Sequence, residues 1–378
     1  MAKKKIANPF LVEEYAGPTY FCDRKKETEM LESALVNGNN VTLTAPRRMG
    51  KSGLIWHVFQ DIERKDKDAV CVYFDILGTR NMTEFVELFA RTVLSESEKK
   101  GQSLFRKVVS FLSTLRPVMT FDSLTGNPVF SVDMTRTQAE NSLERIFDSI
   151  EQSGRTFYVA IDEFQQLTCY QEGYKPEALL RSRIQLLRNA RFVYSGSSMR
   201  LMSEMFASAA RPFYASSQLM SLDAIGEKAY FKFAEKFFKE KDLALSEQVF
   251  HFLHTCFEGH TWYMQKVLNM LYARAESVVE EAQVLSVIDS FLKENTLYFQ
   301  SLVRVLSANQ TAVLKAVAKE GEVKELRSAP FILKYALPAS SSIALAVKFL
   351  VENDLLYRNE RGVYRVYDRF FGIWLARR

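Results

Sequence analysis

Short apolar runs alternate with longer segments of helical periodicity along the first 222 residues of the chain. The runs that predict strands are 41–44, 69–75, 157–161, 191–198 and 218–222. The segments that predict helices between them are 25–35, 54–59, 81–112 and 138–152. Strands that are apolar on both faces and alternate with helices indicate an α/β fold with a parallel sheet.

Two further patterns interrupt or follow this alternation. Residues 118–122 and 129–132 flank a turn sequence at 124–127, which predicts a β-hairpin insertion at about 117–133. After residue 222 the pattern is helical, at 225–241, 246–257, 262–277 and 281–297. The first of these helices carries an aromatic stripe that includes Phe233 and Phe237, which is typical of packing inside a helical bundle.

The last 70 or so residues predict helices at 309–319, 330–335 and 340–353, and then a hairpin formed by 355–358 and 363–366. Three helices and a hairpin are the winged-helix arrangement, which can place its third helix in a DNA major groove. That helix carries only Lys348 as a cation, whereas the hairpin offers Arg358, Arg361 and Arg365. The pattern therefore favours phosphate contact over base reading. Winged helices also serve as protein-binding modules, which is the alternative.

Residues 45–52, Ala-Pro-Arg-Arg-Met-Gly-Lys-Ser, match the phosphate-binding pattern Gly-x-x-x-x-Gly-Lys-Ser/Thr at seven of eight positions. Ala45 stands at the first glycine, which is tolerable if that position needs no positive φ. Lys51 would contact the outer phosphates and Ser52 would bind Mg²⁺. A strand-to-helix turn that binds nothing is the alternative. The candidate nucleotide-binding residues here are Ala45, Pro46, Arg47, Arg48, Met49, Gly50, Lys51, Ser52 and Gly53.

Asp162 and Glu163 follow a strand that is apolar throughout, and ligand sites in α/β sheets lie at the carboxyl ends of strands. Asp162 would hold Mg²⁺, and Glu163 would orient or deprotonate the attacking water. An exposed acidic turn is the alternative. At the end of the next strand, Ser195 and Ser197 are candidates to bond the γ-phosphate or the water, although a Ser/Gly turn is the simpler interpretation of that segment.

Arg200 and Arg211 lie shortly after this strand. Either could sense the γ-phosphate or act as an arginine finger on a neighbouring subunit, and at least one is expected to be a solvated surface residue.

Taken together, these motifs resemble the archaeal-type ATPases, a branch of the signal-transduction (STAND) ATPases within the AAA+ group that is also abundant in Bacteroides-like bacteria. The residues that carry the resemblance are 17–24 with Glu27, 45–52, 161–165, 195–198, 211–214, Tyr367, Asp368, Phe371 and Trp374. The resemblance implies that Tyr20, Phe21 and Arg24 line the adenine pocket. Many relatives have Gly-Arg after the Pro-x-Tyr motif, where this chain has Ala215 and Ser216, so Arg200 or Arg211 would take the arginine role or hydrolysis would be slow.

We therefore expect an α/β P-loop core of the AAA+/ASCE type with a helical lid and a C-terminal winged helix. The expected parts are an N-terminal arm at 1–16, the core at 17–223, the lid at 224–298 and the winged-helix domain at 299–378. Residues 301–378 hold 13 Lys and Arg against 7 Asp and Glu, a net charge of +6, and the rest of the chain therefore carries −1, which suggests an acidic partner for this segment. No apolar run reaches the roughly 20 residues of a membrane span, and the cysteines are scattered, so a cytoplasmic protein is expected.

The function that these observations favour is a Mg²⁺-dependent ATPase that works as a nucleotide-driven switch, slow or stimulated by a partner. Its cofactors would be ATP and Mg²⁺, and its partner double-stranded DNA or a protein, with oligomerisation open. One alternative is an initiator-like DNA-binding protein that uses ATP as a loading signal. Another is a scaffold that binds ATP without hydrolysing it.

Overall fold

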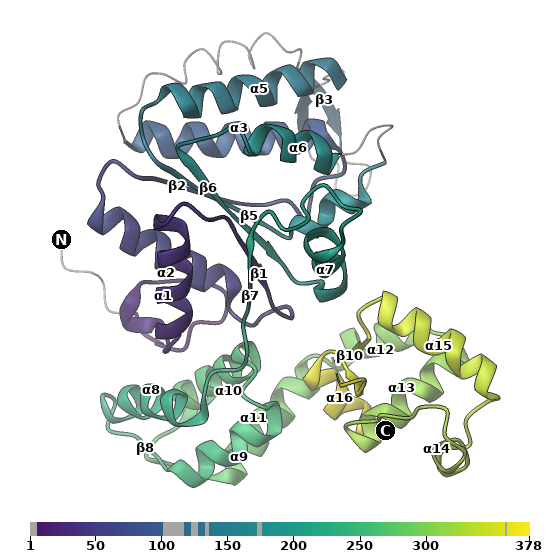
Figure 1. Cartoon of the computed structure of the whole chain (residues 1–378). Coiled ribbons are helices and arrows are strands. Elements are labelled where there is room, and N and C mark those ends of the chain that lie inside the picture. The colour runs from purple at the N-terminus through teal and green to yellow at the C-terminus, as the bar shows by residue number, and fades with distance from the viewer. Residues whose placement is uncertain (1–5, 101–116, 122–127, 133–135, 172–175, 360) are drawn as a thin grey trace. The chain divides into compact units, whose positions relative to one another are not determined.

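The computed structural model describes residues 6–100, 117–121, 128–132, 136–171, 176–359 and 361–378. Contacts among these residues divide the chain into two compact units, and Figure 1 shows their elements. The sheet unit lies within residues 13–230 and 260–262. The helical unit lies within residues 6–12, 231–259 and 263–378.

A five-stranded parallel sheet forms the centre of the sheet unit, as the sequence predicts. Its strands are β1 (Val41–Thr44), β2 (Val70–Asp75), β5 (Phe157–Asp162), β6 (Ala190–Gly196) and β7 (Gln218–Ser221). Their order across the sheet is β2-β5-β6-β1-β7. Strand β6 therefore separates β1, which leads into the phosphate-binding motif, from β5, which ends in the acidic pair.

Helices cover both faces of this sheet (Figure 1). The helices α1 (Lys25–Val36) and α2 (Lys51–Lys65) lie on one face, and α3 (Met82–Lys99), α5 (Arg136–Gln152) and α6 (Pro176–Ile184) lie on the other. Because side chains alternate along a strand, a central strand can contribute to both layers. In β5, Tyr158 and Ala160 join the core on the α2 side, whereas Val159 and Ile161 join the core on the α3 side.

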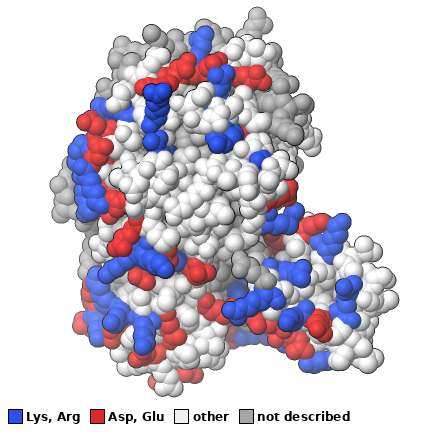
Figure 2. Space-filling model, in the orientation of Figure 1, with Lys and Arg blue, Asp and Glu red and all other residues white. Residues whose placement is uncertain are grey.

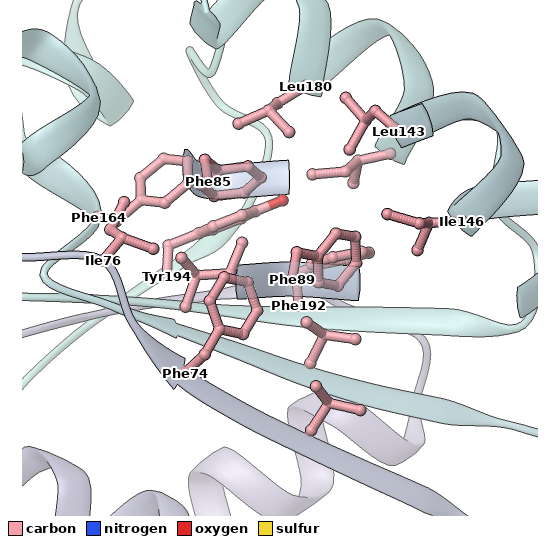
Figure 3. Close-up of a cluster of buried hydrophobic side chains, with 14 of the residues drawn as sticks. Phe74, Ile76, Phe85, Phe89, Leu143, Ile146, Phe164, Leu180, Phe192 and Tyr194 are labelled. Atoms are coloured by element: carbon pink, nitrogen blue, oxygen red, sulfur yellow. The ribbon is translucent and has the colours of Figure 1, made fainter. Parts of the chain in front are cut away.

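The core on the α3 side is dominated by aromatic residues, and Figure 3 shows part of it. Phe89 packs its ring against Phe74 at 5.2 Å, Phe85 at 6.1 Å and Phe147 at 5.7 Å between centroids. Tyr194, at the end of β6, is also fully buried in this layer. The layer therefore sets the position of the strand ends that carry the candidate catalytic residues.

Some elements of the sheet unit match the sequence-based prediction, and others were not predicted. The predicted hairpin is confirmed, with β3 (Pro117–Phe121) and β4 (Pro128–Val132) antiparallel. The helix predicted at 81–112 is confirmed over Met82–Lys99, and residues 101–112 lie outside the described residues. Helices α6 and α7 (Met199–Ala207) and the 3₁₀ helices η1 (Pro18–Tyr20) and η2 (Phe164–Cys169) were not predicted.

Helices fill the first part of the helical unit, as predicted, but two boundaries were wrong. The helices are α8 (Glu227–Lys239), α9 (Glu247–Phe257), α10 (Thr261–Arg274), α11 (Glu281–Glu294) and α12 (Thr296–Arg304). The helix predicted at 281–297 ends at Asn295, whose Nδ2 donates to Phe291 O at 2.8 Å, and α12 then begins. The helix predicted at 262–277 ends at Arg274 because the chain enters β9 (Val278–Val279), which pairs with β8 (Ala244–Leu245).

The C-terminal segment has the predicted helices and hairpin and one further helix. These elements are α13 (Ala308–Glu320), α14 (Ala329–Tyr335), α15 (Ser340–Glu352), β10 (Leu356–Arg358), β11 (Tyr364–Val366) and α16 (Arg369–Ala376). The unpredicted α16 is capped by the Asp368 side chain, which accepts from Phe371 N at 3.0 Å, and it buries Phe370, Phe371 and Trp374. Because α16 is short, its apolar positions give little periodic signal in the sequence.

The start of the described chain packs within the helical unit. Phe10 is fully buried, and its ring lies 5.5 Å from that of Phe238 and 5.6 Å from that of Tyr272. Asn8 and Asn269 each donate to a backbone carbonyl of the other segment at 2.9 Å. These contacts join residues 8–10 to α8 and α10.

Among the described residues, no single helix is long and apolar enough to cross a membrane. The pair α14 and α15 meets the limits of length and composition only when the two are taken together, and they are bent by 82°.

We predict that Phe89→Ala lowers the free energy of unfolding of the sheet unit by about 3–5 kcal/mol, because it leaves a cavity among packed rings. Chemical denaturation followed by circular dichroism measures this change. Leu186→Ala is the control, since Leu186 is 64% exposed, and it should change the stability by no more than about 0.5 kcal/mol. Equal effects of the two substitutions would contradict the description of this core.

Candidate nucleotide site

The loop between β1 and α2 has the backbone of a phosphate-binding turn. Gly50, with φ 97°, and Arg48, with φ 66°, are in the left-handed region, where glycine is favoured. Ala45 is outside that region, so an alanine fits where the motif has its first glycine. Ala45 N donates to Gly196 O at 3.4 Å, which fixes the loop to the end of β6. Helix α2 begins at Lys51, so its unpaired N–H groups face this loop.

Lys51 is buried within the loop. Its Nζ donates to Ala45 O at 3.1 Å and to Pro46 O at 3.5 Å. Burial lowers the pKa of Lys51, and the nearby carboxylates of Glu163 and Asp162 act in the opposite direction. The ammonium group is therefore close to both acidic residues and has only weak acceptors in the loop, which suits it to a phosphate.

Asp162 is buried at the end of β5 and is surrounded by donors. Its Oδ2 accepts from Ser52 Oγ at 2.8 Å and from Tyr73 OH at 2.5 Å. Burial by itself raises the pKa of this carboxyl, but the hydrogen bonds from Tyr73 and Ser52 and the nearby Lys51 ammonium oppose burial, and the pKa lies below its ordinary value. Asp162 is therefore ionised at neutral pH.

Ser52 and Asp162 are a suitable pair of oxygen ligands for Mg²⁺. This ion is commonly held by one or two protein oxygens, with the rest of its shell from phosphate and water. Within the described part of the chain, no group of three or more His, Cys, Asp or Glu side chains could hold a metal. The donors present thus fit a metal that arrives with a nucleotide rather than a metal held by protein alone.

Glu163 has an unusual backbone conformation for a non-glycine residue, with φ 54° and ψ 40°. Its Oε2 accepts from Ser197 Oγ at 2.6 Å and from Gln165 Nε2. Residues in such left-handed conformations are often held in place at functional sites. The structure thus brings Glu163 and Ser197 together with Asp162, Ser52 and Lys51.

The remaining candidate catalytic residues lie elsewhere or are less accessible. Ser195 is fully buried beside Asp162. The Arg211 guanidinium forms ion pairs with Glu177 and, at 3.0 Å, with Glu204. The Arg200 side chain is 79% exposed and lies 3.7 Å from Glu204. The two arginines are therefore engaged with acidic residues beyond the end of β6.

Comparison with known proteins identifies the type of site. Residues 21–267 match the family described as an ATPase domain predominantly from Archaea. The chain belongs to this family of ATPases. Residues 297–377 match a probable winged helix domain. No curated protein matches the chain.

Solved structures of low identity share the fold of this ATPase. A Walker-type ATPase of Pyrococcus abyssi is 17% identical, with a TM-score of 0.66 over 97% of this chain and 99% of that one. The ORC2 protein of Aeropyrum pernix, solved with ADPNP and ADP, is 14% identical, with a TM-score of 0.58 over 98% and 96% of the two chains. The ORC1 protein of the same organism, solved with DNA, is 12% identical, with a TM-score of 0.52 over 98% and 96%.

The family and its fold confirm an α/β P-loop ATPase that binds ATP and carries a C-terminal winged helix.

Three residues expected near the adenine lie before α1. The Phe21 ring stacks on that of His57 with centroids 4.3 Å apart, and it lies beside Gly53. Arg24 is buried and donates to Met49 O at 3.3 Å. Tyr20 ends η1 and is partly buried.

Sequence reasoning missed four residues of this site. Tyr73 and Gln165 contact the acidic pair, and Thr261 and Trp262 contact the loop. Thr261 Oγ1 donates to Met49 O at 3.2 Å, and the Arg48 guanidinium lies 4.2 Å from the centre of a Trp262 ring. Residue type alone does not reveal such contacts, because Tyr73 is 89 positions from Asp162 and Thr261 is 212 from Met49.

We predict that Lys51→Ala weakens ATP binding by about 10- to 150-fold, because a hydrogen bond to a charged group contributes about 1.5–3 kcal/mol. Titration with a fluorescent ATP analogue measures the affinity. Lys65→Ala, at the exposed end of the same helix, is the control and should bind normally. Unchanged affinity in Lys51→Ala would remove the loop from the site.

Proposed function

We propose that this ATPase hydrolyses Mg²⁺-bound ATP and uses the nucleotide as a regulatory switch, with the winged helix as the module for a DNA or protein partner. The observation that supports this proposal most directly is the convergence of Lys51, Ser52, Asp162 and Glu163 at one edge of the sheet. A loop that only binds phosphate would not need two neighbouring carboxylates. Here Asp162 is ionised and hydrogen-bonded, and Glu163 is held in place by its own hydrogen bonds.

In the proposed reaction each of these side chains has one role. Lys51 exchanges its two carbonyl acceptors for the β- and γ-phosphate oxygens. Ser52 and Asp162 would hold Mg²⁺, which would neutralise charge on the phosphates. Glu163 accepts the proton of the water that attacks the γ-phosphate, and Ser197 fixes one of its oxygens.

Among the candidate catalytic residues, Lys51 is the cation that lies in the phosphate-binding loop. Arg211 is neutralised by Glu177 and Glu204, and the exposed Arg200 has one acidic neighbour. We therefore propose slow basal turnover that a partner stimulates, either by freeing one of these arginines or by supplying its own. Oligomerisation would allow Arg200 to serve a neighbouring subunit.

The switch would act through the first turn of α10. Thr261 and Trp262 contact the phosphate-binding loop and belong to the sheet unit, while the helix continues into the helical unit. Arg48 is next to the phosphates in the motif, so a nucleotide competes with Trp262 for its guanidinium. A ligand shifts a conformational equilibrium only through such differential contacts.

The partner of the winged helix is open between DNA and protein. Arg365 of the hairpin is paired with Glu258 and Glu322, which leaves Arg358 and Arg361 for phosphate contact. On the face that Figure 2 shows, cationic and acidic side chains are interspersed. The ORC1 protein of Aeropyrum pernix was solved with DNA, which keeps an initiator-like role as the second candidate.

We further propose the division into an arm at 1–16, a core at 17–223, a lid at 224–298 and a winged-helix domain at 299–378. We also propose that the chain belongs to the STAND branch. These are signal-transduction ATPases, and the proposed switch would couple the nucleotide state to a partner.

We predict that Glu163→Gln keeps ATP affinity but lowers phosphate release by about 100-fold or more, the usual contribution of a general base. Phosphate release from Mg²⁺-ATP is measured at fixed low salt, with and without duplex DNA. Glu151→Gln, on the exposed end of α5, is the control.

Phosphate release with and without DNA distinguishes the candidate functions. Turnover that rises with DNA supports a DNA-coupled ATPase, and turnover indifferent to DNA supports a protein-gated switch. Wild-type protein that binds ATP without releasing phosphate would favour the non-hydrolysing scaffold.

The switch generates a separate prediction for Trp262. The chain has three tryptophans, so Trp56→Phe with Trp374→Phe leaves Trp262 as the sole emitter. Binding of a non-hydrolysable ATP analogue should change its emission, since Arg48 leaves the ring. Lys51→Ala in the same background should show no change, and thermal melts check folding. Identical emission with saturating nucleotide would show that the loop and Trp262 do not respond to it.

A further inference from the structure

Gln165 lies two residues after Glu163, in η2, and its side chain is buried. Its Nε2 donates to Glu163 Oε2, the oxygen that also accepts from Ser197 Oγ at 2.6 Å. Within the described part of the chain, these two bonds are the side-chain hydrogen bonds that Glu163 receives. One carboxylate oxygen is thus held by two donors, and Oε1 is left to accept from a water.

The space for this amide depends on Gly196. A Cβ at Gly196 would lie 2.4 Å from Gln165 Oε1 and 2.5 Å from Met202 Sδ, both too close for real atoms. Gly196 stands between Ser195, beside Asp162, and Ser197, which bonds Glu163. The end of β6 therefore provides both an anchor for Glu163 and the room for a second anchor.

Packing alone does not explain a glutamine at this place. Its Oε1 is buried and has no hydrogen-bond partner among the described residues, which is unfavourable for a carbonyl oxygen. An apolar side chain of similar size would fill the space without that cost. The group that explains a glutamine here is therefore Nε2, which donates a hydrogen bond to Glu163.

The next residue provides an internal comparison. Gln166 is in the same 3₁₀ helix, and its Nε2 donates to Thr79 O at 2.9 Å. That bond ties η2 to the backbone after β2 and does not involve the acidic pair. The two glutamines share residue type and helix, but only Gln165 contacts the carboxylate.

We propose that Gln165 is a positioning residue for ATP hydrolysis, which together with Ser197 clamps Glu163 Oε2 so that Oε1 is presented to the attacking water. This inference rests on the proposed hydrolytic function. The left-handed backbone of Glu163 makes the clamp necessary, because the surroundings must hold a conformation that the residue does not favour by itself.

The test compares Gln165→Met, Gln165→Glu and the matched control Gln166→Met by kcat and KM for ATP. Gln165→Met should lower kcat about tenfold or more through loss of one bond to a charged group, with KM within about twofold. Gln165→Glu nearly keeps the shape of the side chain but replaces the donor with a carboxylate that repels Glu163, so kcat should fall at least as far. Gln166→Met should keep both kcat and KM within about twofold of wild type.

The outcomes are distinct. Wild-type kcat in folded Gln165→Glu would overturn the inference and leave the proposed function standing. An equal fall of kcat in Gln166→Met would also overturn it, since the effect would then belong to η2 as a whole. Wild-type protein without turnover would overturn the proposed function, and the inference with it. If Gln165→Met does not fold, the nearly isosteric Gln165→Glu decides.

Discussion

The buried carboxylate of Asp162 is the constraint on which the site depends. A charge in this position is tolerated only if donors surround it, because removal from water is otherwise costly. Its donors are Ser52 from the first turn of α2 and Tyr73 from β2, with the Lys51 ammonium nearby. One buried charge thus fixes the relative positions of β5, β2 and the start of α2, which directly follows the phosphate-binding loop.

The order of the strands makes this convergence possible. Because β6 lies between β1 and β5, its end touches both halves of the site. Gly196 is paired with Thr44 and accepts a hydrogen bond from Ala45 N, while Ser197 bonds Glu163. The end of β6 therefore connects the loop to Glu163 over one or two residues.

The C-terminal segment shows how tertiary contacts change the meaning of a charge count. Residues 301–378 are basic by sequence, yet three of their arginines have acidic partners outside that range. Arg365 and Arg369 share Glu258, and Arg377 lies 2.6 Å from Asp289. Exposed Leu345, at 73%, adds an apolar position to the third helix of the winged helix. The surface offered to a partner is therefore less basic than the segment considered alone.

The sequence by itself determined the strand and helix pattern of the core, the phosphate-binding loop, the acidic pair and the winged-helix order. These depend on local chemistry: apolar periodicity, glycine at a positive φ, and a lysine and serine at the start of a helix. Ala45 can replace the first glycine of the motif for a local reason as well, because its φ is not positive.

Only the tertiary structure decided which side chains meet. Tyr73 reaches Asp162 because β2 and β5 are neighbours, and Arg211 is neutralised because Glu177 folds next to it. The pairing of Gln165 with Glu163, and of Thr261 with the loop, likewise depends on how turns and distant helices pack. Local patterns set the conformation of each segment, whereas contacts between segments far apart in the chain follow from strand order and packing, which no local pattern specifies.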